Sequence, residues 1–139
     1  MPPKAVIGRF APSPTGDLHF GSLVSAVGSY LEAKSAGGKW LIRVEDIDPP
    51  REVTGSAKRI IDDLEKTGMV SDGPVLYQQD RYPAYKKAIA ELLDSGRAYP
   101  CACSRKDLPD SGLYPGTCRH GIEGEKPPRS IRFLASDQV

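Results

Sequence analysis

Arg9-Phe10-Ala11-Pro12-Ser13-Pro14-Thr15-Gly16, followed by Leu18-His19-Phe20-Gly21-Ser22, is the stretch that decides the fold of this 139-residue chain. It begins in a short, mostly apolar run, 5–10, and continues into a loop rich in proline and glycine, a pattern typical of a buried strand and a turn. From Leu23 the apolar residues follow a helical period, which ends at Gly37-Gly38. The stretch therefore predicts a strand, a loop and a helix in direct succession.

The alternation of strand and helix continues toward the C-terminus. Apolar runs predict further strands at 40–44 and 75–77, and helical periodicity predicts further helices around 60–64 and 82–93, each with a glycine just beyond its end. Strands that alternate with helices are typical of an α/β domain with a parallel sheet. We therefore expect an α/β fold for this part of the chain.

A change in composition marks a boundary near residue 98. After Pro100 the sequence is rich in Cys, Gly, Pro and charged residues and loses its periodicity. We predict two parts, 1–97 and 98–139, the second ending in a strand at 130–134 that has nothing after it to pair with. The three cysteines are too few and too closely spaced for a disulfide framework.

Composition excludes few functions. Hydrophobic residues make up 39% and charged residues 27% of the chain, as in ordinary soluble proteins, and the net charge is +1. A nearly neutral total neither requires nor excludes a nucleic-acid partner, because a local basic face can lie within it. No apolar run approaches the roughly 18 residues of a membrane span, and the start of the chain lacks an apolar secretion signal. We expect a cytoplasmic protein with no membrane partner.

The first loop is a candidate phosphate site. In an open parallel sheet, ligands bind beyond the carboxyl ends of the strands, and a helix N-terminus there attracts anions. His19 and Ser22 could donate hydrogen bonds to phosphate oxygens, and Gly21 would let a nucleotide lie close to the backbone. The alternative is that the loop is only a connection and His19 a capping or surface residue.

An acidic cluster follows the second predicted strand. Glu45, Asp46 and Asp48 would lie beside the first loop, where a carboxylate could hold the ammonium group of an amino acid. Arg9 could hold a carboxylate in a bidentate fork. The alternative is a solvated acidic turn before two prolines.

Three cysteines are candidate metal ligands. Cys101, Cys103 and Cys118 supply soft thiolates that suit a closed tetrahedral Zn²⁺ site. The alternative is three free cysteines in a loop. For a fourth ligand, chemistry alone favours His120, because imidazole is a far commoner zinc ligand than phenol.

The first loop and helix also resemble the first signature of the glutamyl and glutaminyl branch of class I aminoacyl-tRNA synthetases, which ends in H-I-G-H or a close variant. Here the variant is His-Phe-Gly-Ser at 19–22. The resemblance implies a Rossmann-like parallel sheet that binds ATP with Mg²⁺ as substrate. It implies that His19 and Ser22 are catalytic, aiding attack of an amino-acid carboxylate on the α-phosphorus. The implied ATP-binding residues are Pro12, Ser13, Thr15, Gly16, His19, Gly21 and Ser22.

The run Arg43–Arg51 resembles the amino-acid site of the same synthetases, whose glutamate contacts the substrate amino group. The resemblance implies an L-glutamate site made by Arg9, Phe10, Ala11, Pro12, Ser13 and Glu45. The form Asp46–Arg51 and the run Gly21-Ser22-Leu23 look more like glutamyl-Q tRNA(Asp) synthetases than full glutamyl-tRNA synthetases. The former load glutamate onto the queuosine of tRNA(Asp), and that tRNA is the implied partner.

The resemblance also bears on the cysteines. Glutamyl-Q synthetases carry C-x-C, then Tyr, then Cys, which favours Cys101, Cys103, Tyr114 and Cys118 as ligands of one structural zinc. Some full glutamyl-tRNA synthetases instead use C-x-C with C-x-H, which His120 would complete. We take Tyr114 as the fourth ligand and keep His120 as the alternative.

The resemblance covers nearly all of the chain but only about half of a family member. Residues 1–97 would be the N-terminal half of the ATP- and glutamate-binding domain, and 98–139 a zinc-binding insert with the start of the connective region. The family's second signature, a K-M-S-K-S-like loop, has no counterpart here. We therefore expect the chain alone to bind ATP weakly without turnover, and the complete enzyme to be a monomer. The alternatives are a fragment of a glutamyl-tRNA synthetase that charges tRNA(Glu), and a non-catalytic zinc-bearing module that binds nucleotide or tRNA.

Overall fold

The computed structural model describes residues 5–135. Its internal contacts divide the chain into two compact units, Met1–Tyr82 and Pro83–Val139. The helix predicted at 82–93 therefore belongs, by its contacts, almost entirely to the second unit. The functional division that we predict between residues 97 and 98 stays a prediction.

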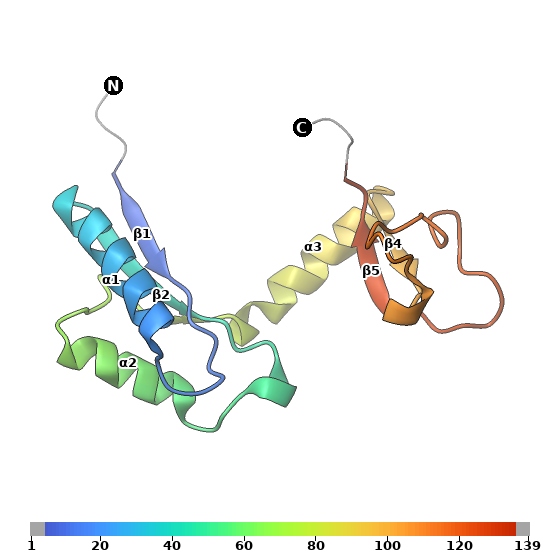
Figure 1. Ribbon diagram of the computed structural model, residues 1–139. Coiled ribbons are helices and arrows are strands. Elements are labelled where there is room, and N and C mark those ends of the chain that lie inside the picture. The colour runs from blue at the N-terminus through green and yellow to red at the C-terminus, as the bar shows by residue number, and fades with distance from the viewer. Residues whose placement is uncertain (1–4, 136–139) are drawn as a thin grey trace. The chain divides into compact units, whose positions relative to one another are not determined.

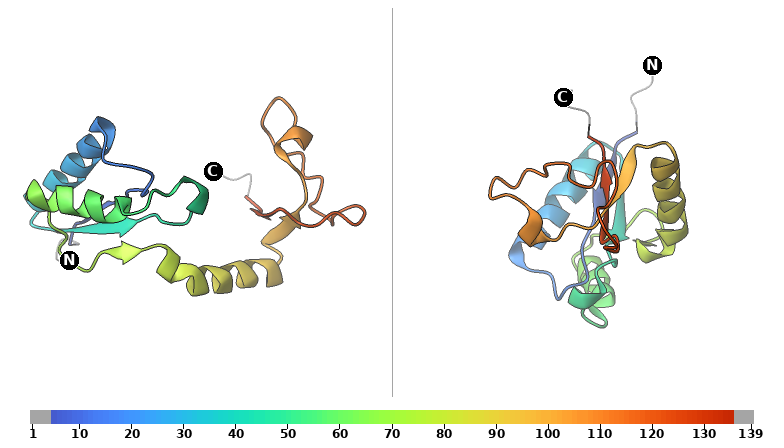
Figure 2. Two further views of the ribbon diagram at one scale, coloured as in Figure 1. Left: turned by 90° about the horizontal axis from the view of Figure 1, so that it is seen from below. Right: turned by 90° about the vertical axis from the view of Figure 1, so that its right-hand side faces the viewer.

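The first unit is built on a parallel sheet of three strands in the order β1 (Ile7–Phe10), β2 (Lys39–Val44) and β3 (Leu76–Tyr77). Phe10 pairs with Ile42, and Val44 with Tyr77. The crossover helices α1 (Phe20–Ser35) and α2 (Ser56–Lys66) lie on the same side of the strands (Figures 1 and 2). A short 3₁₀ turn, η1 (Pro49–Arg51), precedes α2. The predicted α/β fold with a parallel sheet is confirmed.

Trp40 is the centre of the core of this unit. Its side chain is fully buried on β2, with the ring of Phe10 stacked at 6.3 Å and that of Tyr30 edge-on at 5.2 Å. The indole N–H is not left unpaired, since it donates to the hydroxyl of Ser29 on α1 at 3.0 Å. Around it pack Ala26, Ala33, Ile42, Ile60, Leu64 and Met69. Both helices are therefore held to the sheet through one core.

The apolar period of α1 predicts the helix but not the face that it buries. Val24, Val27 and Leu31 are 55%, 41% and 59% exposed, whereas the buried residues are Ala26 and Ala33. Small residues face the sheet because the helix lies very close to β1. The larger apolar side chains form a stripe on the opposite side of α1.

The second unit contains α3 (Tyr82–Asp94) and an antiparallel pair, β4 (Ala98–Cys101) and β5 (Ser130–Phe133). The strand predicted at 130–134 is confirmed as β5, and its partner is the preceding strand β4, with Ala98 opposite Phe133 and Cys101 opposite Ser130. Sequence analysis missed β4 because Pro100 and the cysteines interrupt its apolar pattern. A proline is tolerated there because a two-stranded sheet consists only of edges.

Two 3₁₀ turns complete the structure, η2 (Gln79–Arg81) before α3 and η3 (Arg105–Asp107) after β4. Within the described residues, α3 buries none of its side chains. None of the helices between residues 5 and 135 is both long and apolar enough to cross a membrane.

Replacement of Gly8 by alanine tests the close contact between α1 and β1. A Cβ at Gly8 would lie 2.8 Å from the Cβ of Ala33 and 2.9 Å from the carbonyl oxygen of Ser29. We expect Gly8→Ala to lower the free energy of unfolding by about 1–3 kcal/mol, as overpacked cores do. The measurement is urea unfolding followed by circular dichroism.

Gly28→Ala is the matched control, because a Cβ at this position on α1 meets no described atom within 4 Å. It should leave stability unchanged or raise it by about 0.5–1 kcal/mol, since alanine favours the helix over glycine. Equal effects of the two substitutions would contradict the close contact.

Candidate nucleotide site and cysteine cluster

A pocket of about 550 Å³ lies beyond the carboxyl end of β1, between the following loop and the start of α1. We call it the loop pocket. Ten of the residues predicted for ATP or glutamate line it: Arg9, Phe10, Ala11, Pro12, Ser13, Thr15, Gly16, His19, Gly21 and Ser22. Asp17, Leu18, Ser25 and Ile60 complete the lining. The structure thus brings most of the first signature to one place, at the edge of the sheet where ligands of parallel α/β folds bind.

The N-terminus of α1 opens onto the loop pocket. His19 is its N-cap: Nδ1 accepts a hydrogen bond from the backbone N–H of Ser22 at 3.3 Å, and Nε2 lies 3.1 Å from the Ser22 hydroxyl. The first turn of α1 contains no acidic residue. Free N–H groups and the helix dipole therefore face the pocket, and the carboxylate of Asp17 in its lining is paired with Arg59 at 2.7 Å. This is the arrangement that binds phosphate groups.

Hydrogen bonds from distant segments fix the shape of the loop. The Ser56 hydroxyl, fully buried at the start of α2, donates to the carbonyl oxygen of Gly16 and accepts its N–H at 3.2 Å. The carbonyl oxygens of Pro12 and Pro14 accept N–H groups of Glu45 and Val53, both at 2.9 Å. Each of these bonds joins the loop to the end of β2 or to the segment leading into α2.

The three acidic residues after β2 have different surroundings. The buried carboxylate of Asp46 accepts the backbone N–H of Gln79 at 3.0 Å, so Asp46 caps the turn η2. Asp48 is paired with Arg51 on the surface. Glu45 lies outside the lining of the loop pocket, and its half-buried carboxylate accepts a hydrogen bond from Arg43 at 2.5 Å. Of the three, only Glu45 combines a place beside the loop with an available carboxylate.

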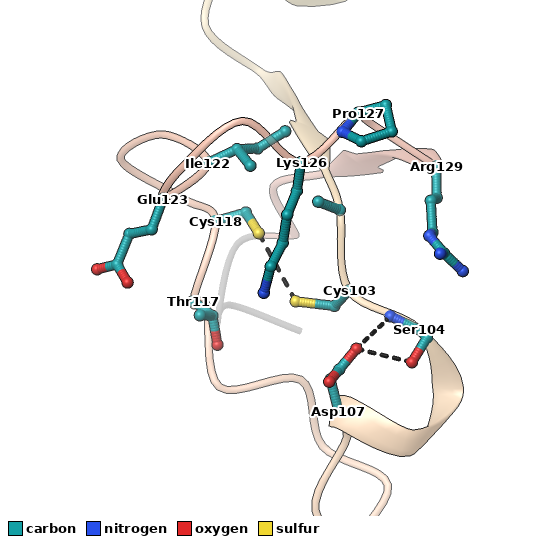
Figure 3. A pocket seen from close by; sticks show the side chains of 11 residues that line it. Cys103, Ser104, Asp107, Thr117, Cys118, Ile122, Glu123, Lys126, Pro127 and Arg129 are labelled. Carbon is teal, nitrogen blue, oxygen red and sulfur yellow. Dashed lines mark hydrogen bonds between the residues drawn. The ribbon is translucent and has the colours of Figure 1, made fainter.

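In the second unit the side chains of Cys101, Cys103 and Cys118, the cysteine cluster, lie within 4.8 Å of one another. Cys103 Sγ is 3.6 Å from Cys118 Sγ (Figure 3). The Tyr114 hydroxyl lies 3.4 Å from Cys101 Sγ and 3.8 Å from Cys103 Sγ. The exposed His120 is not part of this cluster. The three cysteines could hold a metal ion.

The thiols of the cysteine cluster differ in acidity. Burial raises the pKa of Cys101, but hydrogen bonds from Tyr114 and Arg132 more than compensate and bring it to about 6. A hydrogen bond with Cys118 raises the pKa of Cys103. The hydrogen bond that Tyr114 donates to Cys101 raises the pKa of the phenol. These hydrogen bonds therefore favour the thiolate form of Cys101, which is the form that binds cations.

Sequence analysis did not single out Ser25, which lines the loop pocket, or Ser56, which is bonded to Gly16 in that lining. Ser25 lies one turn after Ser22 on α1, so the helical period could have indicated it. Ser56 had no such signal, because its partner Gly16 is 40 positions away in the sequence.

A parallel α/β unit with a helix N-terminus beyond the carboxyl end of its first strand is the arrangement typical of nucleotide-binding domains. Residues 5–112 match the sequence profile of a known protein family, the catalytic domain of class I tRNA synthetases (E and Q). The chain belongs to this family.

Within the family, the chain is similar to glutamyl-Q tRNA(Asp) synthetases. It is 58% identical over 117 residues to that of Pseudomonas paraeruginosa, covering 84% of this chain and 40% of the relative. It is 54% identical over 135 residues to that of Dechloromonas aromatica, covering 91% and 45%. The chain thus spans less than half the length of these curated relatives. A crystal structure of a glutamate tRNA ligase from Elizabethkingia meningosepticum, in complex with its amino acid, superposes with a TM-score of 0.68 at 38% identity, covering 76% of this chain and 22% of the ligase.

Replacement of Ser56 by alanine tests how the loop is held. The change leaves the N–H and carbonyl groups of Gly16 without their buried partner, which costs about 1–3 kcal/mol of unfolding free energy. We also expect the Gly16 amide to exchange its hydrogen faster, as measured by NMR. Ser35→Ala, which removes an exposed hydroxyl bonded only within α1, is the control. A Gly16 amide equally protected in both variants would show that Ser56 does not hold the loop.

Proposed function

We propose that this chain forms the ATP- and glutamate-binding part of a cytoplasmic enzyme that activates glutamate with ATP and transfers it to the queuosine of tRNA(Asp). The observation that carries the proposal is the identity of 52–58% to glutamyl-Q tRNA(Asp) synthetases over 82–94% of the chain. The gathering of the first signature around one pocket supports it. Because the chain spans only part of these relatives, the reaction would also need residues that lie outside it.

ATP, with Mg²⁺, would lie with its phosphates at the N-terminus of α1. The reaction is attack of the glutamate carboxylate on the α-phosphorus, with pyrophosphate as the leaving group. It needs alignment of the two reactants and positive charge around the developing negative charge, and little proton transfer. The N–H groups of α1 would supply part of that charge. His19 and Ser22, which are hydrogen-bonded to each other at the N-terminus of α1, would contact the phosphates.

Glutamate would lie between Arg9 and Glu45. Arg9, at the end of β1, lines the loop pocket and could hold a substrate carboxylate in a fork. Glu45 would accept the substrate ammonium. Arg43 already binds Oε1 of this carboxylate, which leaves its second oxygen for the substrate.

A second candidate is a glutamyl-tRNA synthetase that charges tRNA(Glu). The superposition on a glutamate tRNA ligase favours it, since that enzyme takes the same amino acid. Its identity of 38% is well below the 52–58% to glutamyl-Q synthetases. The acceptor in the proposal is therefore tRNA(Asp).

The cysteine cluster would hold one structural zinc. In a tetrahedral site with Zn–S near 2.3 Å and Zn–O near 2.0 Å, ligand atoms lie about 3.5–3.8 Å apart. The distances among Tyr114 Oη, Cys101 Sγ, Cys103 Sγ and Cys118 Sγ that the structure gives are 3.4, 3.6 and 3.8 Å. This agreement favours Tyr114 over His120 as the fourth ligand. A bound zinc would displace the phenol proton that now bonds to Cys101.

Elemental analysis of the chain, purified without added metal, tests the zinc proposal. We expect close to one zinc per chain, and we expect Tyr114→Phe to lose it to a chelator faster than the unchanged chain. His120→Ala is the matched variant and should retain zinc, because His120 lies outside the cluster. If His120→Ala lost zinc rapidly while Tyr114→Phe retained it, the fourth ligand would be His120 and not Tyr114. Three freely titratable thiols without metal would refute the zinc site itself.

A chimera tests the reaction, with this chain replacing the matched segment of the Pseudomonas aeruginosa glutamyl-Q tRNA(Asp) synthetase, to which it is 56% identical. We expect glutamate-dependent ATP–pyrophosphate exchange and glutamylation of tRNA(Asp) that bears queuosine. Arg9→Ala and Glu45→Ala should each raise the KM for glutamate, because a charged substrate group loses its partner at a cost on the order of 2–4 kcal/mol.

The same tRNA(Asp) without queuosine, and tRNA(Glu), are the control substrates. Charging of tRNA(Glu) in place of tRNA(Asp) would support the second candidate. Exchange that survives both substitutions with an unchanged KM would refute the glutamate pocket.

A further inference from the structure

We propose that Arg132, on β5, is a positioning residue for the metal centre formed by the cysteine cluster and Tyr114. Its Nε–H donates a hydrogen bond to Cys101 Sγ at 3.1 Å. Its guanidinium carbon lies 3.6 Å from the centre of the Tyr114 ring. One side chain thus contacts two of the four groups that would bind zinc. The inference rests on the zinc site proposed above.

The shape and charge of the guanidinium suit both contacts at once. A planar group can donate an N–H in its own plane and still stack its face on an aromatic ring, which the compact ammonium of lysine cannot do. The donated hydrogen bond fixes the direction in which the Cys101 lone pairs point, and the stacking fixes the tilt of the Tyr114 ring. Groups that orient metal ligands in this way strongly affect how firmly the metal is held.

The charge of Arg132 serves the same end. Three thiolates and a phenolate carry more negative charge than one Zn²⁺ ion neutralises. Cys101 is fully buried, so water cannot disperse the excess at this sulfur. A cation in direct contact with Cys101 and Tyr114 offsets it where it is least solvated.

Arg132 lies on the last strand in the sequence, β5, and the pairing of β5 with β4 brings it to the cysteine cluster. Arg132 lies opposite Tyr99 on β4, and the backbone N–H of Arg129 donates to the carbonyl oxygen of Cys101 at 2.9 Å. The spacing of the cysteines gives no hint of this residue, which follows the last of them by 14 positions. The strand β5 would therefore contribute to the metal centre as well as pairing with β4.

Zinc release from the chain tests the proposal. The zinc-loaded wild type, Arg132→Met and Arg132→Lys are mixed with excess chromogenic chelator at neutral pH, and the rate of zinc loss is recorded. We expect Arg132→Met to release zinc about tenfold faster or more, in line with the effect of other groups that orient metal ligands. Arg132→Lys keeps the charge but not the paired contacts, and should fall between the two.

Arg97→Met is the matched control. Arg97 also lies over an aromatic ring of this sheet, Phe133, at 5.6 Å, but the hydrogen bonds to sulfur among residues 5–135 come from Tyr114, Arg132 and the cysteines themselves. It should release zinc at the wild-type rate. The spectra of the Co²⁺-substituted chains give a second readout: Arg132→Met should shift the thiolate-to-cobalt charge-transfer bands, whereas Arg97→Met should not.

Each outcome bears on one proposal. A wild-type chain that binds no zinc would refute the zinc site, and the present inference with it. Zinc bound normally, with equal release from wild type and Arg132→Met, would refute the role of Arg132 alone. Equally fast release from Arg97→Met and Arg132→Met would mean that any change in the sheet loosens the metal, and would also refute it. If Arg132→Met does not fold, the rate and spectrum of Arg132→Lys decide the question: wild-type values for both would refute the role of Arg132.

Discussion

The close contact of α1 with β1 at Gly8 is the constraint on which the nucleotide site depends. Because Gly8 has no side chain, Ser29 and Ala33 come so near that a single methyl group would overlap both. The helix axis is thereby fixed against the strand, and with it the position of the helix N-terminus beyond the end of β1. The loop pocket is the space that this arrangement leaves between the two. A helix held farther away by larger residues would turn the same N–H groups toward open solvent.

The loop itself is shaped by the rest of the unit more than by its own residues. Backbone groups of Pro12, Pro14 and Gly16 are bonded to Glu45, Val53 and Ser56, each from beyond β2. The loop pocket and Glu45 are consequently parts of one network, although Pro12 and Glu45 are more than thirty positions apart in the sequence. His19 illustrates why the two interpretations of the first signature do not exclude each other. It is a capping residue, and the cap directs its ring and the N–H groups of α1 to the same pocket.

Local patterns were sufficient for the helices and strands of the first unit, and the resemblance to class I synthetases named ten of the residues that line the loop pocket. The strand, loop and helix follow directly from period and glycine placement, and the signature residues are contiguous in the sequence. The features that the sequence could not show depend on contacts between residues that are far apart in the sequence. The buried face of α1 is set by the contact at Gly8 and not by the most apolar stripe, so Val24 and Leu31 are exposed. The strand β4 is recognisable only with β5 beside it, and Ser56 only with Gly16.

For the cysteines too, the sequence indicates part of the site, and the rest depends on the geometry of the fold. Their spacing indicates a metal site, but the choice between Tyr114 and His120 depends on where a turn places two side chains that are six positions apart. The structure also shows why the second unit would need such a site. Among its described residues, the buried apolar side chains are Ala98, Cys101 and Cys118, and the main hydrophobic cluster contains none of them. An antiparallel pair of four-residue strands with so small a core cannot offset the conformational entropy lost by the long loop between them. Four bonds from Cys101, Cys103, Tyr114 and Cys118 to one metal ion would link the end of β4 to this loop, and the positive charge of Arg132 on β5 would stabilise the metal centre. These bonds would supply the cross-links that a hydrophobic core supplies elsewhere.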